Sequence, residues 1–134
     1  MHIFDPIVGN PAAPHRLVNR TRGGTLALHV EAAFDSQSRR RGLLGRTSLP
    51  VDSVLAIAPS NAVHSFGMAF PIDLLFIRRD GVVIKRVIHL KPRRIAAALR
   101  AFAVLEFAAD HPGVAATQVG DVLGVEMTSS AVSA

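Results

Sequence analysis

The 134-residue chain contains no cysteine, no tryptophan and no tyrosine, so seven phenylalanines supply all of its aromatic residues. Without cysteine the protein cannot form a disulfide, a zinc–thiolate site, an iron–sulfur centre or a thiolate nucleophile. Without tryptophan or tyrosine it lacks the aromatic platforms on which nucleic-acid bases commonly stack, and it has no helix-turn-helix signature. We therefore expect neither specific nucleic-acid binding nor a bound cofactor.

Long hydrophobic runs are also missing. No apolar segment approaches the roughly 20 residues that a membrane-spanning helix requires. Residues 1–11 carry neither the basic stretch nor the sustained apolar stretch of a secretory signal peptide. We expect no membrane span and a cytoplasmic location for this sequence. An exported form is the alternative if a leader has been trimmed from the N-terminus.

Acidic residues are outnumbered, with 10 aspartates and glutamates against 15 lysines and arginines, which gives a net charge of +5. The basic residues gather in short clusters at positions 39–41, 78–79, 85–86 and 91–94. Such clusters most simply form solvated faces and turns, although they also suit small anions or an acidic protein surface. A small anionic ligand or a protein partner is therefore the kind of partner we expect.

Apolar alternation and turn residues predict a succession of short strands. Gly23–Gly24 separates the two arms of one hairpin, and Asp80–Gly81 supplies the positive φ of a second. Asp35 suits the N-cap of a helix over 36–44, and Asp110 that of a helix reaching about Val119. Residues 95–100 form one or two helical turns or a loop. The strands are expected at residues 16–19, 25–31, 54–58, 70–78, 82–90, 102–108 and 122–127.

These elements predict one globular domain over residues 16–127. An irregular arm with three prolines precedes it at residues 1–15, and a flexible tail follows at 128–134. With 49% hydrophobic and 19% charged residues, a chain of this length can bury a core of its own. The expected fold is a β-rich α+β domain with a mostly antiparallel curved sheet, barrel-like or jelly-roll-like, and about two short helices.

Segment 61–77 places polar residues among residues that are typical of a core. Asp73 lies in a run that is apolar on both faces of the predicted strand, which favours a central strand. A carboxylate there needs a partner or an altered pKa. Asp73 is either a ligand contact or general base, or half of a structural ion pair with Arg39 or Arg46. His64 either shares a pocket with Asp73 or is a hydrogen-bonded core histidine.

Further candidates lie on either side of this segment. Gly67 permits either the close approach of a ligand or a bulge at a bend of the sheet. Glu106 is isolated in an apolar strand. Like Asp73, it is either a ligand contact or general base, or half of a structural ion pair with a neighbouring arginine. Arg39 and Arg46 are the best candidates for binding an anion, because the guanidinium group matches carboxylate and phosphate geometry. No His-x-x-His or His-Glu-x-x-His spacing occurs, so we predict no metal site.

Four segments together resemble a known family: RRRGLLGR at 39–46, FPIDLLF at 70–76, VLE at 104–106 and GD at 120–121. The chain resembles domain-of-unknown-function family 192 from about Arg16 to Val125. It departs from the commoner pattern at residues 64–68, where HSFGM replaces a Trp-Met-Lys-Asn-Thr run, and it is similar to a variant branch of the family. The resemblance implies a β-rich fold and no particular chemistry. It also implies a polar cluster formed by Arg39, Arg46, Asp73, Glu106 and Asp121.

Three hypotheses of function follow. The first is a small non-catalytic binding or accessory module with a polar pocket near residues 64–73. The second is a hydrolase or isomerase that uses His64 and Asp73 as an acid–base pair. The third is a protein-interaction module that uses a basic face around Arg39–Arg41, which predicts salt-dependent association.

Overall fold

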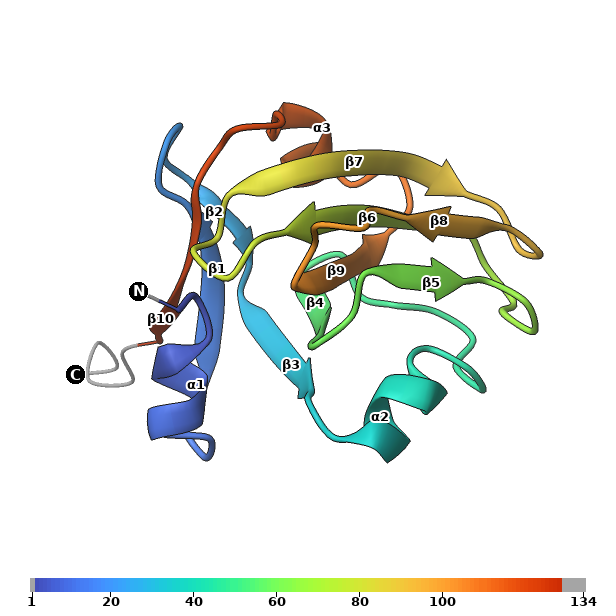
Figure 1. Ribbon diagram of the computed structural model, residues 1–134, viewed down its shortest axis with the longest axis horizontal. Helices are drawn as coiled ribbons and strands as arrows, with labels where there is room; N and C mark the ends of the chain where they lie inside the picture. Colours follow the sequence, from blue (N-terminus) through green and yellow to red (C-terminus); the bar gives the residue numbers. More distant parts are fainter. Residues whose placement is uncertain (1, 129–134) are drawn as a thin grey trace.

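The computed structural model describes residues 2–128, and a five-stranded sheet lies at its centre (Figure 1). Neighbouring strands are antiparallel except for the parallel pair β3 and β4. Strand β6 lies between β9 and β7, and all six of its residues are buried, which confirms the predicted central strand. The spatial order is β3 (His29–Ala33), β4 (Ser53–Ile57), β9 (Ala103–Ala108), β6 (Ile72–Ile77) and β7 (Val83–Leu90).

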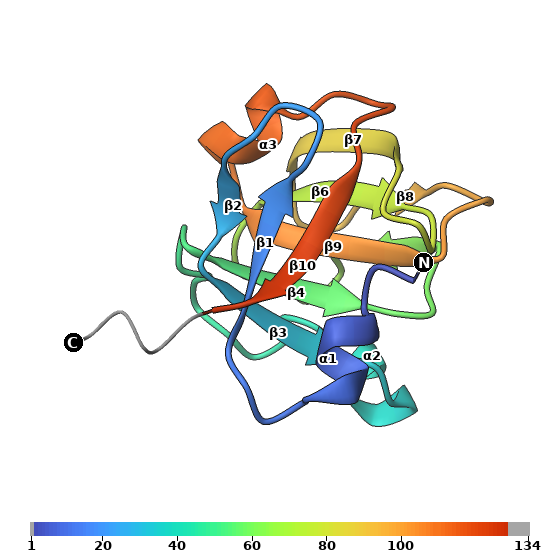
Figure 2. The same cartoon turned by 90° about the vertical axis from the view of Figure 1, so that its left-hand side faces the viewer.

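A three-stranded antiparallel sheet covers one face of the central sheet, and its strands cross the central strands steeply (Figure 2). It consists of β1 (His15–Asn19), β2 (Thr25–Ala27) and β10 (Leu123–Met127). Strands β1 and β2 form the hairpin predicted at Gly23–Gly24. The side chains between the two sheets form a first core, which includes Leu17, Leu26, Leu75, Leu105, Phe107 and Leu123.

The N-terminal segment differs from the irregular arm that the sequence predicted. Helix α1 occupies Asp5–Gly9 and has Pro6 in its first turn, where the missing N–H breaks no helical hydrogen bond. Ile3, Phe4 and Ile7 are buried in the first core. These three buried side chains therefore hold this segment beside β10 (Figure 2).

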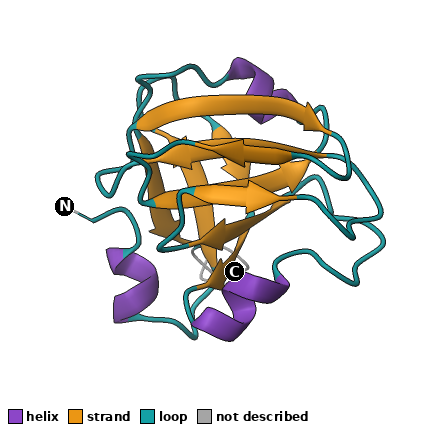
Figure 3. Ribbon diagram, turned by 45° about the vertical axis from the view of Figure 1, so that its right-hand side comes forward, coloured by secondary structure: helices purple, strands orange, loops and turns teal. Residues whose placement is uncertain are grey.

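The other face of the central sheet is covered by the short antiparallel pair β5 (Ala62–His64) and β8 (Ile95–Ala97) (Figure 3). The prediction of helical turns or a loop at 95–100 was wrong for β8, because pairing with β5 gives these residues a strand ladder. A second core lies on this face and includes Leu43, Leu55, Leu74, Phe76 and Val104.

Turn and cap residues explain where several elements begin and end. Gly81 has a φ of +90° in the predicted Asp80–Gly81 turn between β6 and β7. Asp35 caps helix α2 (Ser36–Arg41), since its carboxylate accepts a hydrogen bond from the Ser38 backbone N–H at 2.7 Å. This helix ends before the predicted Leu44, because the backbone turns at Gly42 with a φ of +47°.

Helix α3 (Pro112–Ala116) is capped by His111 and not by the predicted Asp110, and it ends before Val119. The His111 Nδ1 atom accepts the backbone N–H groups of Gly113 and Val114 at 3.0 and 3.4 Å. An imidazole nitrogen thus does here what the side-chain oxygen of a serine, threonine, aspartate or asparagine does at many helix starts.

The predicted fold class is confirmed: the chain forms a single β-rich domain with mostly antiparallel sheets. Within residues 2–128 there are three short helices where about two were expected, and the sheets do not close into a barrel. None of these three helices is long and apolar enough to span a bilayer. Apart from Thr128, the predicted tail lies outside the described residues.

Candidate functional site

The Asp73 side chain is fully buried and is satisfied by backbone donors. Its two carboxylate oxygens accept hydrogen bonds from the backbone N–H groups of His89, Asp110 and His111 at 2.8, 3.0 and 2.8 Å. His89 and Asp110 have φ values of +56° and +57°, which side-chain-bearing residues seldom adopt. Asp73 therefore anchors two tight loops, and neither ion pair considered for it, with Arg39 or Arg46, is formed.

Strand register places Asp73 and Glu106 on opposite faces of the central sheet. Asp73 lies directly across from Phe107, whereas Glu106 lies across from Leu74. Residues directly opposite on antiparallel strands point to the same face. Phe107 belongs to the first core and Leu74 to the second, so Asp73 faces the three-stranded sheet and Glu106 faces away from it.

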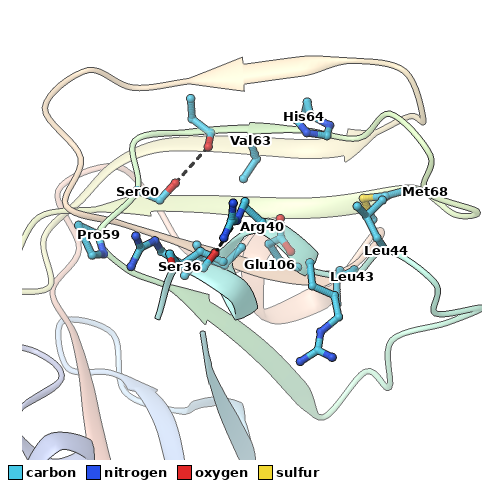
Figure 4. Close-up of a pocket in the computed structure, with 15 residues that line it drawn as sticks. Ser36, Arg40, Leu43, Leu44, Pro59, Ser60, Val63, His64, Met68 and Glu106 are labelled. Atoms are coloured by element: carbon cyan, nitrogen blue, oxygen red, sulfur yellow. Dashed lines mark hydrogen bonds between the residues drawn. The ribbon is translucent and has the colours of Figure 1, made fainter. Parts of the chain in front are cut away.

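Strand β5 lies on the Glu106 side of the sheet, so His64 and Asp73 do not meet. The pocket that the sequence predicted between these two residues is not assembled. A pocket of about 550 Å³ instead opens on the second-core face, between α2, β5 and the central sheet (Figure 4). Of the predicted site residues, this pocket brings together His64, Arg39 and Glu106.

The Glu106 carboxylate is an ionisable group in a buried position of this pocket. Only 3% of the residue is exposed, and its Oε1 atom has no hydrogen-bond partner among the described residues. Burial raises the pKa of Glu106 from 4.5 to about 7, and the positive charge of Arg46 opposes only part of that shift. At neutral pH this group is therefore balanced between a carboxylic acid and a carboxylate.

Gly42 keeps the space beside this carboxylate open. A Cβ atom at residue 42 would lie 3.9 Å from Glu106 Oε1, in ordinary van der Waals contact. The glycine also ends α2 with a backbone conformation that favours glycine. The carboxylate consequently faces an opening rather than a packed side chain.

Helix α2 lines the pocket with Arg39, Arg40 and Arg41. The Arg39 Nη1 atom donates to the Phe34 carbonyl at 2.9 Å, and the Arg40 Nε atom donates to the Ser36 carbonyl at 3.2 Å. These bonds orient the two guanidinium groups and leave most of their five N–H donors for other partners. Figure 4 labels Arg40 and Glu106 among the side chains that line the pocket.

Arg46 does not line the pocket. Its Nη2 atom donates to both carboxylate oxygens of Glu31, at 2.9 and 2.8 Å, on the protein surface. The Arg46 charge still lowers the pKa of Glu106 without a direct contact between the two side chains. The predicted direct pairing of Glu106 with a neighbouring arginine is therefore not formed.

The bend after β5 supports one side of the pocket. His64 is exposed at the pocket rim, and its ring centroid lies 5.8 Å from that of Phe66. Gly67 has a φ of +82°, and a Cβ atom there would lie 3.3 Å from the Leu44 side chain, which lines the pocket. Gly67 thus makes the predicted tight bend and is not itself among the lining residues.

Ser65 is a structural residue whose role sequence reasoning missed. It is fully buried, and its hydroxyl donates to the Lys91 carbonyl at 2.6 Å. The same oxygen accepts the Arg94 backbone N–H at 2.9 Å. Its only sequence signal is a small polar residue in an apolar segment, and that signal does not indicate which loop the hydroxyl would bind.

Asp121 belongs to a separate cluster at the start of β10. Its carboxylate accepts hydrogen bonds from Arg22 Nε at 2.7 Å and from the Asn19 side chain and Gln118 backbone at 3.0 Å each. Burial tends to raise the pKa of Asp121, but these bonds and the Arg22 charge outweigh burial and lower the pKa to about 2. The single polar cluster implied by the family resemblance is therefore divided among separate places.

Most of the lining positions were not singled out as site residues, among them Arg40, Gly42 and Met68. Arg40 lay within the basic cluster recognised at positions 39–41. Within residues 2–128 no group of three histidine, aspartate or glutamate side chains is arranged to hold a metal ion.

Two solved structures share this fold. A putative transcription regulator from Sinorhizobium meliloti is 24% identical, with a TM-score of 0.71 over 84% of this chain and 92% of that one. A protein of unknown function from Novosphingobium aromaticivorans is 20% identical, with a TM-score of 0.69 over 82% of each chain. No curated protein matches the sequence. The family model DUF192, described as an uncharacterised ACR, matches residues 17–125, and the chain therefore belongs to the DUF192 family.

Proposed function

We propose that this protein is a small, non-catalytic binding module that holds a small ligand in the pocket between α2, β5 and β9. The observation that carries the proposal is the buried Glu106 carboxylate, whose Oε1 atom has no partner within residues 2–128. Leaving a buried polar group unsatisfied costs about 1–3 kcal/mol, and more when the group is charged. A ligand that donates a hydrogen bond to this carboxylate would recover that energy.

The shape and lining of the pocket support a small-molecule ligand. Its volume of about 550 Å³ falls within the roughly 300–1,000 Å³ range of ligand pockets. Leu43, Ile57, Val63 and Met68 give it apolar walls. An apolar cavity with a few converging polar groups is the usual form of a small-molecule site.

The positions of His64 and Asp73 favour binding over the acid–base chemistry considered above. A general acid and a general base must both reach the reacting atoms. His64 lines the pocket rim, but Asp73 faces the first core and is already bonded to three backbone N–H groups. Glu106 is the only aspartate or glutamate among the described residues that line this pocket.

A protein partner is the competing interpretation, because Arg39, Arg40 and Arg41 also form a basic face at the pocket rim. The two interpretations differ in what they require of Glu106. An acidic protein surface would bind the arginines and would not depend on a carboxylate that is 3% exposed.

A thermal-shift screen with sugars, carboxylates, phosphates and amines tests the proposal. Wild type is compared with Glu106→Gln, and Glu126→Gln serves as the matched control because Glu126 pairs with Arg16 on the surface of β10. A ligand at a hundred times its dissociation constant stabilises the folded state by about 2.7 kcal/mol. We expect a shift in wild type and in the control that Glu106→Gln reduces.

Equal shifts in all three proteins for every active compound would contradict a pocket centred on Glu106. The protein-interaction interpretation replaces the proposal if no compound shifts the melting temperature of wild type but an acidic protein binds it. Arg40→Glu should then abolish that binding, and Glu106→Gln should leave it unchanged.

A further inference from the structure

The arginines of α2 differ in their pairing from five of the other ten arginines of the protein. Arg16, Arg20, Arg22, Arg46 and Arg78 all form ion pairs with carboxylates. Within the described residues, no carboxylate lies within 4.0 Å of the Arg39, Arg40 or Arg41 guanidinium groups. Three uncompensated positive charges therefore line a pocket that contains one acidic side chain.

This charge balance selects an anion. Two of the guanidinium groups are held by backbone carbonyls, which orients them without using up their donors. A preoriented guanidinium group binds a carboxylate or a phosphate through paired hydrogen bonds. A ligand with one such group would meet the arginines of α2 at the rim.

Glu106 sets a second requirement, because its Oε1 atom needs a hydrogen-bond donor. An ammonium group could donate, but it would bring a further positive charge into a pocket that three arginines line, which is unfavourable. A hydroxyl group donates without adding charge. The Glu106 carboxyl group therefore favours a hydroxyl over an amine.

The walls set a third requirement, since Leu43, Ile57, Val63 and Met68 offer only apolar contact. The C–H groups of a short carbon chain or sugar ring would pack against them. The pocket thus combines an anion-binding rim, an apolar wall and a buried hydrogen-bond acceptor.

We propose that the ligand is a small hydroxylated anion, such as a sugar acid or a sugar phosphate. Its anionic group binds Arg40 and its neighbours on α2, and one of its hydroxyl groups donates to Glu106. This inference rests on the proposed function, because it names the class of ligand for the same pocket.

Four compounds of similar size separate the parts of this proposal. Gluconate carries both a carboxylate and hydroxyl groups, hexanoate carries only the carboxylate, and sorbitol carries only the hydroxyl groups. Glucose 6-phosphate distinguishes a phosphate from a carboxylate. Binding is measured by isothermal titration calorimetry, and the binding surface is mapped by NMR shifts of backbone amides in α2 and β5.

We expect gluconate or glucose 6-phosphate to bind at least tenfold more tightly than hexanoate and sorbitol, as the loss of one charged hydrogen bond implies. Arg40→Gln should lower the affinity for the hydroxylated anion about tenfold and reduce the salt dependence of binding. Glu106→Gln should remove most of the advantage of gluconate over hexanoate. Arg20→Gln, on the far sheet beside Glu126, is the control and should change nothing.

Equal affinity for sorbitol and gluconate would overturn the anionic part of the inference. Equal affinity for hexanoate and gluconate would overturn the hydroxyl part. In both cases the proposed function survives if Glu106→Gln still weakens binding. Failure of all four compounds to bind at millimolar concentrations would overturn the ligand class, and the broader screen would then decide the proposed function separately.

Discussion

The Glu106 carboxyl group couples the stability of the fold to pH. Its folded pKa of about 7 lies above the ordinary value of 4.5, so the folded state holds this proton more tightly than the unfolded state does. The associated stability is fully present below pH 4.5 and is lost as the pH rises through 7. A pKa shift of this size corresponds to a loss on the order of 3 kcal/mol in the free energy of unfolding.

Glu106→Gln should remove this pH dependence, because the amide has no proton to lose. We expect the variant to match wild type near pH 4.5 and to be more stable by up to about 3 kcal/mol at about pH 8. Urea unfolding followed by far-UV circular dichroism at both pH values measures the difference. A constant difference between the two proteins across this range would contradict the burial of an unpartnered carboxyl group.

Asp73 leads to the opposite expectation, since each of its oxygens has a backbone donor. In Asp73→Asn, an NH2 group must face a backbone N–H, so we expect a loss of about 2 kcal/mol or more in unfolding free energy. Ligand binding at the pocket should persist below the lowered melting temperature. His64→Ala is the matched control and should stay within about 0.5 kcal/mol of wild type, because this side chain is exposed.

An Asp73→Asn variant that keeps full stability but loses ligand binding would return Asp73 to the binding site.

The burial of Asp73 follows from its strand pattern, but the identity of its hydrogen-bond partners does not. They are backbone groups of loops 16, 37 and 38 residues away, and nothing in the sequence marks them. Arg39 and Arg46 looked like the natural partners because charge is visible in a sequence and backbone donors are not.

The turn between β6 and β7 shows how a single glycine permits contact between elements. Gly81 has a φ of +90°, and a Cβ atom there would collide with the Leu123 carbonyl of β10. Its own carbonyl accepts the Leu123 backbone N–H at 2.9 Å. The turn that joins these two strands of the central sheet is therefore also a contact with the three-stranded sheet.

We predict that Gly81→Ala lowers the unfolding free energy by about 2–4 kcal/mol, from backbone strain and from the collision. Gly9→Ala is the control, because nothing lies within 4 Å of its added methyl group at the end of α1. It should be neutral or slightly stabilising. Thermal melts of both variants test this, and similar melting temperatures would show that the turn can relax away from β10.

The Asp80–Gly81 turn was predictable because the turn residues themselves encode it. Strand β8 was not, because Ile95–Ala97 has little alternation and becomes a strand only by pairing with β5, which lies 33 residues earlier. The cap of α3 was missed for a related reason. Asp110 is the commoner cap residue, but its backbone N–H bonds to Asp73, and its φ of +57° moves the helix start to His111.

At the scale of the whole molecule, β6 contributes to both cores. Leu75 and Ile77 point into the first core, whereas Leu74 and Phe76 point into the second. Composition and alternation indicated a β-rich domain with a central strand. They did not reveal which strands pair across long distances, such as β1 with β10, where His15 lies opposite Met127. The layers follow from those pairings, and so does the pocket on one face.

A sheet shared by two cores should unfold as one unit. We predict that Phe4→Ala in the first core and Phe76→Ala in the second each lower the unfolding free energy by about 3–5 kcal/mol. Each variant should keep the denaturant dependence of wild type, because both cores lose their packing in the same transition. The chain has no tryptophan or tyrosine, so circular dichroism and amide hydrogen exchange replace intrinsic fluorescence as probes.

Amide exchange distinguishes one cooperative unit from two. If the fold is one unit, Phe4→Ala accelerates exchange by the same factor in the protected amides of β1 and β6, because both open only with global unfolding. If the layer of α1, β1, β2 and β10 opens alone, Phe4→Ala accelerates exchange in β1 and leaves β6 nearly unchanged. In that second case a ligand bound beside Glu106 would protect β6 and β9 without protecting the three-stranded sheet, and the two faces of the central sheet would be energetically independent.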